Sequence, residues 1–367
     1  MASIAKRPDG QWRARYRDTA GKEHARHFAR KVDAQRWLNE VTASIVTGMY
    51  VDPRAGNVTF EAYAERWRSI QRHRPATAEL VERILRIRVY PRIGNLPLNK
   101  VLRSDVQAMV SAWEVSPATA QMTYRFVSSI FKSAVHDRKI AGTPCVEIKL
   151  PEIIEEKVSP LSTDTVHAII GALPGRYQAL ALVAAGTGMR QGEVFGLTAD
   201  RVLFLERKIR VDRQLVGLSG HAPTFGPPKT RASNREIPLP TVVGEALAAH
   251  IATYPPGEDG LIFTGSQGQA LRRSAFGEVW RSAVAEAGAA GVVFHSLRHY
   301  YASLLIRHGE SVKTVQDRLG HRSADETLRT YAHMWPDADD RTRAAVDLVL
   351  GAPADSMRTE GQEVMPS

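Results

Sequence analysis

HSLRHYYASLLIRHGESVKTVQDRLGHRSADETLRTY, residues 295–331, is the stretch around which this chain is organised. Its pattern predicts a helix that begins near Ser296 and ends at Gly309. A second short helix is expected between Ser311, a favourable N-cap residue, and Gly320, a residue type that commonly ends helices. The fold of this region should therefore be a pair of helices, each closed by a glycine.

The same stretch concentrates His295, Arg298, His299, His321 and Tyr331. A phosphodiester gains negative charge when a nucleophile adds to phosphorus, and a planar, permanently charged guanidinium such as that of Arg298 suits that charge. A tyrosine with an ordinary pKa of about 10 is a weak nucleophile, so it needs nearby cations and a proton acceptor. Imidazoles supply the proton acceptor, and the set as a whole suits a phosphodiester attacked by a phenol.

HSLRHYYASLLIRHG, LGH and TLRTYAH together resemble the second conserved region of the tyrosine recombinases, the phage integrase family, in which His, Arg, His and the nucleophilic Tyr occur in this order. AAGTGMRQGEVFGL, residues 184–197, resembles the first region of that family and contains Arg190. Between them, PPKTRASNREIPLP matches the family's β-hairpin lysine at Lys229. The resemblance covers roughly residues 1–345, and Tyr300 departs from it where the family often has threonine.

The resemblance implies a catalytic set of Arg190, Lys229, His295, Arg298, His321 and the nucleophile Tyr331. Tyr331 would form a 3′-phosphotyrosyl link and release a 5′-hydroxyl, while Lys229 protonates the leaving oxygen. The implied function is a site-specific integrase that moves a phage or other mobile element into and out of DNA. Four protomers would act on two DNA sites through a Holliday junction, with a host bending factor and a directionality factor as further partners.

Composition limits the class of protein. The chain has 367 residues, 43% of them hydrophobic, which predicts two or three domains with cores of their own. The single Cys145 excludes an intramolecular disulfide and a cysteine-cluster zinc site, and it fits a reducing compartment. No apolar run reaches the ~20 residues of a membrane span, and no signal peptide is evident. We therefore expect the protein in the bacterial cytoplasm, associated with the nucleoid.

The net charge of +10 is unevenly distributed. Residues 1–54 carry +5, residues 55–147 carry +6, and residues 148–367 carry −1. An excess of positive charge in one part of a chain is typical of a protein that binds a polyanion, although a merely solubilising surface is the alternative.

The N-terminal segment predicts a small three-stranded sheet and a helix. In GQWRARYRD, apolar and aromatic residues alternate with Arg13, Arg15 and Arg17, so one strand face should carry only guanidiniums. Asp33 is expected to cap the following helix. Residues 1–54 resemble the arm-type DNA-binding domain of phage integrases, and the arginine face would contact DNA there. The alternative is an ordinary solvated strand face.

Three further parts complete the expected multidomain α+β fold. Residues 55–150 resemble the all-helical, SAM-like core-binding domain, in which Arg83 and Arg86 would contact DNA. Residues 158–345 would be a mainly helical catalytic domain with a small sheet, and 351–367 a disordered tail. KIRVDRQLV and REIPLP predict strands, and the same pattern places Lys229 on the hairpin joining them.

The sequence also bears on other functions. His295 and His299 are four residues apart and could share a metal, but no HExxH pattern is present, so we expect no metal. No GxxxxGK[ST] motif occurs, and we expect no cofactor. A DNA-binding regulator that has lost cleavage, and a type IB topoisomerase-like enzyme, remain as alternatives.

Overall fold

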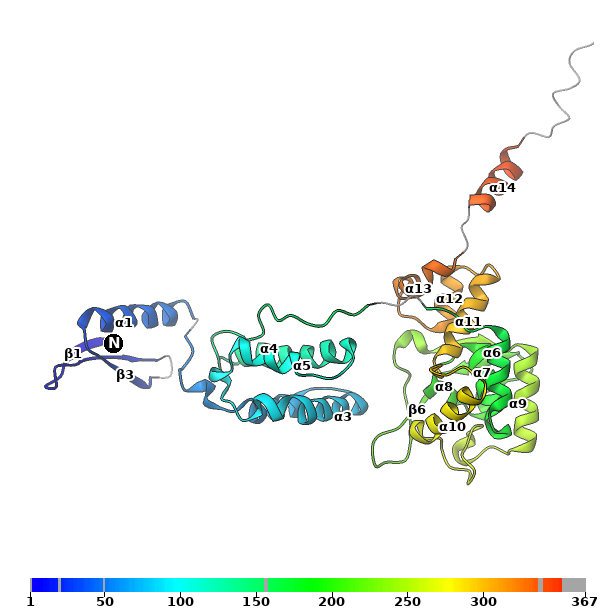
Figure 1. The fold of residues 1–367 in the computed structure, drawn as a ribbon, viewed down its shortest axis with the longest axis horizontal. Helices are drawn as coiled ribbons and strands as arrows, with labels where there is room; N and C mark the ends of the chain where they lie inside the picture. Colours follow the sequence, from blue (N-terminus) through cyan, green and yellow to red (C-terminus); the bar gives the residue numbers. More distant parts are fainter. Residues whose placement is uncertain (1, 19–20, 49, 155–157, 336–338, 352–367) are drawn as a thin grey trace, which may run out of the picture. The chain divides into compact units, whose positions relative to one another are not determined.

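The computed structural model describes residues 2–18, 21–48, 50–154, 158–335 and 339–351. It divides into two compact units, residues 1–155 and residues 156–367 (Figure 1). Among the described residues, no helix is both long enough and apolar enough to cross a membrane. The expected disordered tail lies outside the described residues, apart from Gly351.

The first unit begins with a three-stranded antiparallel sheet covered by one helix. Its elements are β1 (Ser3–Lys6), β2 (Trp12–Arg17), β3 (Glu23–Phe28) and α1 (Lys31–Val46), in strand order β1-β2-β3. The alternation expected for β2 is present, because Ala14 and Tyr16 are buried while Arg13, Arg15 and Arg17 are exposed. Tyr16 packs edge-on against Trp37 of α1, with 5.5 Å between ring centroids.

The cap predicted for α1 is wrong. Arg30 occupies the N-cap position and makes no side-chain capping bond there. Asp33 lies inside the first turn, where it pairs with Arg30 across 2.9 Å. A carboxylate in the first turn interacts favourably with the positive end of the helix dipole. Asp33 therefore stabilises the N-terminus of α1 without capping it.

The rest of the first unit is helical. Its elements are η1 (Ala55–Asn57), α2 (Phe60–Ile70), α3 (Pro75–Ile84), η2 (Leu85–Gly94), η3 (Leu98–Lys100), α4 (Arg103–Ser111) and α5 (Pro117–His136). Phe60 and Phe131 meet in the core at 5.1 Å between ring centroids. Tyr63 donates to Asp137, the C-cap residue of α5, and Trp67 donates to Ser133, so two partly buried hydrogen bonds join α2 to α5.

One helical feature of this unit was not expected. α3 continues without a break into η2, a stretch of wider π-helical turns that accommodates Pro91. Arg92 also lies within this stretch. Wider turns leave some carbonyls without helical partners, and that of Arg88 accepts a bond from Trp113 Nε1 at 3.1 Å.

The second unit is mainly helical, as expected, with small sheets at one side. Its helices are α6 (Thr163–Ala172), α7 (Gly175–Thr187), α8 (Gln191–Phe195), α9 (Thr241–Thr253), α10 (Arg273–Glu286), α11 (Ser296–Arg307), α12 (Val312–Leu319), α13 (Ala324–Tyr331) and α14 (Asp339–Leu350), with short 3₁₀ turns η4 (Ala199–Arg201), η5 (Arg231–Ser233), η6 (Glu258–Gly260) and η7 (Ala332–Met334). α7 forms the centre, because Leu180, Val183 and Ala184 are fully buried between α6, α9 and α11.

The strands of the second unit differ from the single hairpin that was expected. β4 (Val202–Leu203), β5 (Lys208–Val211) and β8 (Arg235–Pro238) form one sheet in that order, and β6 (Gln214–Val216) pairs with β7 (Thr224–Gly226) in another. KIRVDRQLV is therefore two strands. The two strands separate at Asp212 and Arg213, whose side chains form an ion pair. Asp212 also pairs with Arg201.

The helices predicted in the opening stretch are confirmed. α11 is followed by Gly309 at φ +84°. α12 is capped by Ser311, whose hydroxyl accepts from the Thr314 amide at 3.1 Å, and it ends at Gly320 in the left-handed conformation. α13 then carries Tyr331 as its last residue.

Candidate active site

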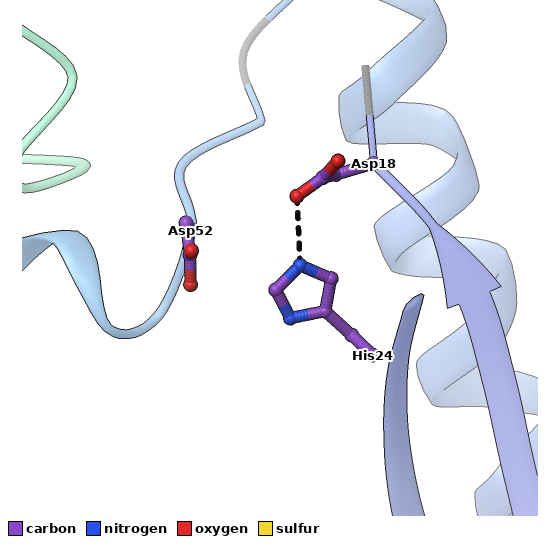
Figure 2. Close-up of side chains that lie close together, drawn as sticks. All are labelled: Asp18, His24 and Asp52. Atoms are coloured by element: carbon purple, nitrogen blue, oxygen red, sulfur yellow. Dashed lines mark hydrogen bonds and ion pairs between the residues drawn. The ribbon is translucent and has the colours of Figure 1, made fainter. Parts of the chain in front are cut away.

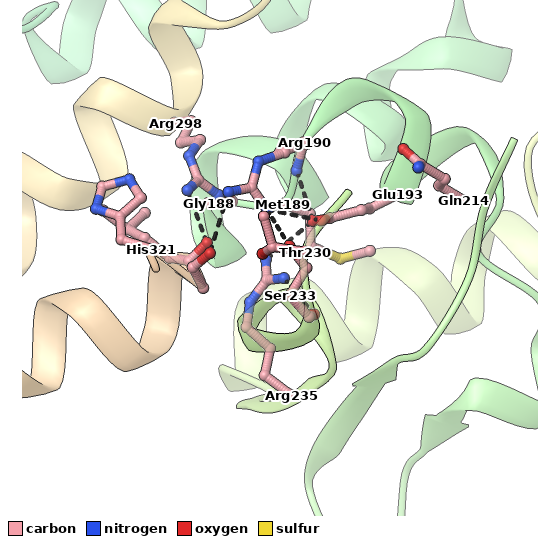
Figure 3. A network of polar contacts seen from close by, with 12 residues as sticks. Gly188, Met189, Arg190, Glu193, Gln214, Thr230, Ser233, Arg235, Arg298 and His321 are labelled. Atoms are coloured by element: carbon pink, nitrogen blue, oxygen red, sulfur yellow. Dashed lines mark hydrogen bonds and ion pairs between the residues drawn. The ribbon is translucent and has the colours of Figure 1, made fainter. Parts of the chain in front are cut away.

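Arg298 lies at the centre of the site and is only 3% exposed. Its Nη1 donates to the Gly188 carbonyl and its Nη2 to the Leu319 carbonyl, both at 2.7 Å (Figure 3). The turn after α7 and the end of α12 are thereby attached to α11. Burial, together with the charges of Arg190 and Arg235, lowers the pKa of Arg298 to about 9, so this guanidinium is still charged at neutral pH.

Arg190 is the N-cap residue of α8 and is half-buried. Its Nη1 donates to Glu193 at 3.0 Å and to Ser233 at 2.9 Å. Its Nη2 donates to the Gly320 carbonyl at 3.1 Å. The Arg190 guanidinium thus joins Glu193 and Ser233 to the end of α12.

Arg235, at the start of β8, was missed from the sequence. Its Nε donates to the Arg318 carbonyl at 2.8 Å and its Nη2 to Glu193 at 3.0 Å. Three guanidiniums, those of Arg190, Arg235 and Arg298, therefore bind the three consecutive carbonyls of residues 318–320 at the C-terminal end of α12. We call this arrangement the arginine clamp (Figure 3).

Among the described residues, one carboxylate pairs with the clamp. Glu193 has a side chain only 1% exposed and lies between Arg235 and Arg190. Its burial acts to raise its pKa, but the two arginines outweigh burial and the net effect is a lowered pKa. The carbonyl end of α12 carries a partial negative charge and helps to balance the remaining positive charge. Guanidiniums have the charge and the forked donors that suit a phosphate.

His321 follows the clamp directly and is buried. Its Nδ1 is 2.8 Å from Thr327 Oγ1, and its ring lies nearly parallel to that of Tyr331 with 6.4 Å between centroids. Burial and the charge of Arg298 lower the pKa of His321 to about 4, so the ring is neutral at physiological pH.

His295, which precedes α11, is more accessible than His321. Its ring meets that of His299 edge-on, with 5.0 Å between centroids. Desolvation of the ring lowers the pKa of His295 to about 4, and electrostatic effects from His299, Arg298, Arg190 and Lys229 act in the same direction. Lys229 itself is exposed, in the connection between β7 and η5 and not on a hairpin between β5 and β8. The structure thus brings all six predicted residues into one region.

Tyr331 is the most deeply buried of the six, at 1% exposure. Its phenol oxygen is 2.7 Å from Nδ1 of His299. Burial raises the pKa of Tyr331 to about 12, against the opposing charge of Arg298. The phenol is therefore protonated at neutral pH.

The basic residues proposed for DNA differ in their surroundings. Arg13, Arg15 and Arg17 share the open face of the first sheet, where the Glu23 carboxylate lies 3.6 Å from Arg13 and 3.9 Å from Arg15. In the helical part, Arg83 is exposed, whereas Arg86 pairs with Glu82 at 3.0 Å.

One group of potential metal ligands occurs in the described part of the chain. Asp18, His24 and Asp52 place their ligand atoms within 4.8 Å of one another (Figure 2). His24 is 2.8 Å from Asp18, and Lys22 places its ammonium 3.4 Å from Asp52. The ammonium of Lys22 balances the negative charge of Asp52. This ion pair joins the segment after α1, which contains Asp52, to the sheet. It lies in the first unit, whereas His295 and His299 lie in the second.

The fold and this site define a tyrosine recombinase. The phage integrase family model matches residues 159–337, the model for the phage integrase N-terminal domain matches 2–47, and that for the phage integrase central domain matches 60–150. The chain belongs to the phage integrase family and is a site-specific recombinase.

Individual proteins agree with this assignment. The integrase of Mycobacterium phage D29 is 26% identical over 314 residues, which cover 81% of this chain and 82% of that protein. The Tn1549 transposon integrase, solved with transposon right end DNA, shares the fold at 24% identity and a TM-score of 0.67, over 80% of this chain and all of that one. A lambda integrase tetramer bound to a Holliday junction matches 88% of this chain and 96% of that one, at 19% identity and a TM-score of 0.55.

Proposed function

We propose that this chain cleaves and rejoins double-stranded DNA through a 3′-phosphotyrosyl bond to Tyr331. The observation that carries the proposal is the convergence of the arginine clamp, His321 and Tyr331 around the end of α12. Arg190 and Arg298 face that point with forked donors, which suit the non-bridging oxygens of a phosphate under attack.

The other polar groups of the site have complementary roles. Lys229 protonates the leaving 5′-oxygen. It is a cation on an exposed connection, and its charge acts to lower the pKa of His295. His295 and His321, neutral at physiological pH, contribute hydrogen bonds and proton transfer. Exchange of a phosphodiester for a phosphotyrosine ester keeps the type of bond, so rejoining needs no nucleotide.

DNA contacts extend beyond the catalytic part. We assign arm-site binding to residues 1–54, through Arg13, Arg15 and Arg17, and core-site binding to residues 55–150, through Arg83 and Arg86. The exposed guanidiniums on one face of the sheet and the excess positive charge of these parts support the assignment. Residues 158–345 are then the catalytic domain.

The comparisons suggest the assembly. Since the lambda integrase forms a tetramer on a Holliday junction, we propose a homotetramer of this chain on two attachment sites. Its biological role would be integration and excision of a phage or other mobile element on the nucleoid, in the cytoplasm of a bacterial host. A host bending factor and an excision directionality factor would be its protein partners.

A nicked DNA duplex that carries the element's core site tests the proposal, because the nick lets the cleaved end diffuse away and traps the covalent adduct. The wild-type chain should give an adduct that survives denaturation, and Tyr331→Phe should give none while still binding the duplex. Tyr301→Phe is the matched control, since Tyr301 is buried in the same cluster as Tyr331.

Three outcomes would contradict the proposal. An adduct that persists in Tyr331→Phe would move the nucleophile elsewhere. DNA binding by the wild-type chain without any adduct would indicate a regulator that does not cleave. Relaxation of supercoiled DNA that has no core site would instead indicate a topoisomerase-like activity.

A further inference from the structure

The phenol of Tyr331 has a defined hydrogen-bond partner. His299 Nδ1, from the second turn of α11, lies 2.7 Å from the phenol oxygen at the end of α13. Their ring centroids are 5.7 Å apart with an interplanar angle of 60°, so the imidazole nitrogen lies beside the oxygen and the two rings do not stack. Within the described residues, no other hydrogen bond to this oxygen is recorded.

The two histidines of the predicted catalytic set have other contacts. His321 uses Nδ1 on Thr327 and turns the face of its ring toward the Tyr331 ring. His295 packs edge-on against the imidazole of His299. Neither is recorded in contact with the phenol oxygen, so geometry favours His299 as the acceptor of its proton.

The surroundings of His299 keep it in the form that accepts a proton. Burial and the charge of Arg298 lower its pKa, so the ring is neutral at physiological pH. A neutral imidazole has one N–H and one lone pair, and a lone pair on Nδ1 requires the proton on Nε2. Three titratable groups contact His299 or shift its pKa: His295 at the N-cap of α11, Arg298 within α11 and Tyr331 from α13.

We propose that His299 is a further catalytic residue, whose Nδ1 takes the phenolic proton of Tyr331 as the phenol oxygen attacks the scissile phosphorus. The inference rests on the proposed role of Tyr331. The O–H bond breaks, the bond between the phenol oxygen and phosphorus forms, and the bond from phosphorus to the 5′-oxygen breaks, with that oxygen protonated by a separate acid. During rejoining, His299 returns the proton to Tyr331, which leaves as a phenol.

Two substrates distinguish a role of His299 as general base from a role as general acid. The nicked core-site duplex is prepared with either oxygen or sulfur at the bridging 5′ position, because a thiolate leaves without protonation. In single-turnover cleavage at saturating protein, His299→Asn should lose roughly 10²-fold or more in rate on both substrates, with DNA affinity retained. His308→Asn is the matched control, an exposed histidine at the end of the same helix, and it should cleave like the wild type.

A second measurement does not depend on DNA or on the fold of a His299 variant. In the full-length chain labelled with ¹⁵N-histidine, one imidazole should show a hydrogen-bonded acceptor nitrogen that disappears in Tyr331→Phe and stays in Tyr301→Phe. No change on Tyr331→Phe would overturn the inference.

The cleavage rates of His299→Asn test the inference independently. Cleavage by His299→Asn within threefold of the wild-type rate, or recovery of its rate by the sulfur substrate, would also overturn the inference. Either result would leave the nucleophile in place as long as Tyr331→Phe forms no adduct. An adduct in Tyr331→Phe would instead refute the proposed function.

Discussion

Arg298 uses two nitrogens of one rigid fork to bind two backbone carbonyls in the interior of the second unit. A lysine at this position has one ammonium and cannot satisfy both carbonyls or bind a phosphate through two parallel bonds. We expect Arg298→Lys to lower single-turnover cleavage by roughly 10²-fold or more at saturating protein. The unsatisfied carbonyl should cost about 1–3 kcal/mol in the free energy of unfolding.

The control for this substitution is Arg307→Lys, at the exposed end of the same helix, where one weak bond to Ser303 is recorded. It should leave both the rate and the urea-unfolding midpoint close to wild type. A native cleavage rate in Arg298→Lys would remove Arg298 from the phosphate site.

At this scale the sequence predicted the six family residues but not His299 or Arg235. His299 was grouped with the other imidazoles of this stretch and considered as a metal ligand beside His295, but it received no catalytic role. Spacing along a helix does not reveal which nitrogen faces which neighbour. Arg235 resembles an ordinary strand residue in REIPLP. Its role depends on Glu193, 42 positions earlier, and on the end of α12, and no local pattern encodes such distant contacts.

The ends of α11 and α12 are both glycines with positive φ, Gly309 at +84° and Gly320 at +65°. A Cβ at Gly309 would meet nothing within 4 Å, whereas one at Gly320 would lie 2.9 Å from the Ala232 carbonyl oxygen. Both alanine variants should lose about 1 kcal/mol from the left-handed conformation. Only Gly320→Ala should also displace the clamp, so it alone should slow cleavage, by tenfold or more.

Thermal unfolding and single-turnover cleavage of the two variants check this prediction. Equal loss of cleavage in Gly309→Ala and Gly320→Ala would mean that backbone strain, and not the contact with Ala232, disturbs the site.

The first sheet, β1-β2-β3, has arginines on both of its faces. Arg13 and Arg15 lie on the open side of the sheet, whereas Arg26 of β3 is paired with Ala14 and stands on the side that α1 covers. We expect Arg13→Ala and Arg15→Ala to weaken binding to arm-site DNA and to lower the slope of log affinity against log salt by about one for each phosphate that the variant no longer neutralises. Arg26→Ala removes the same charge from the other face and should change the slope less.

Binding titrations across a series of salt concentrations give both quantities. Identical slopes for all three variants would indicate that net charge, and not the open face, attracts the DNA.

Secondary structure was predictable where the signal is local. Ser311 and Gly320 mark the bounds of α12, and alternation marks β2. The division of KIRVDRQLV into two strands was not predictable, because it depends on Asp212 pairing with Arg201 of a neighbouring turn. The wide turns around Pro91 likewise involve a distant contact, because Trp113 donates to the carbonyl of Arg88, 25 residues earlier in the chain.

For the molecule as a whole, histidines held neutral in the folded state link stability to pH. His295 and His321 have pKa values lowered to about 4, so the unfolded chain takes up protons below about pH 6.5 that the folded chain does not. Their contribution is fully present above that pH and is lost as the pH falls toward 4. For the buried His321 alone, the loss should be on the order of 2–3 kcal/mol.

Urea unfolding at several pH values, compared between the wild type and His321→Gln, isolates this contribution from that of the carboxylates. The variant should show a smaller decline between pH 6.5 and 4, and His308→Gln, at an exposed site, should follow the wild type. Parallel curves for all three proteins would show that His321 titrates normally in the folded state.

The arginine clamp also determines when conformational entropy is lost. Ordering a long side chain costs up to about 2 kcal/mol, and Arg190, Arg235 and Arg298 are ordered by the carbonyls of residues 318–320 as the chain folds. Folding, and not association with DNA, therefore bears the cost of aligning these donors. A phosphate that enters meets guanidiniums already oriented, so more of the interaction free energy remains for the transition state.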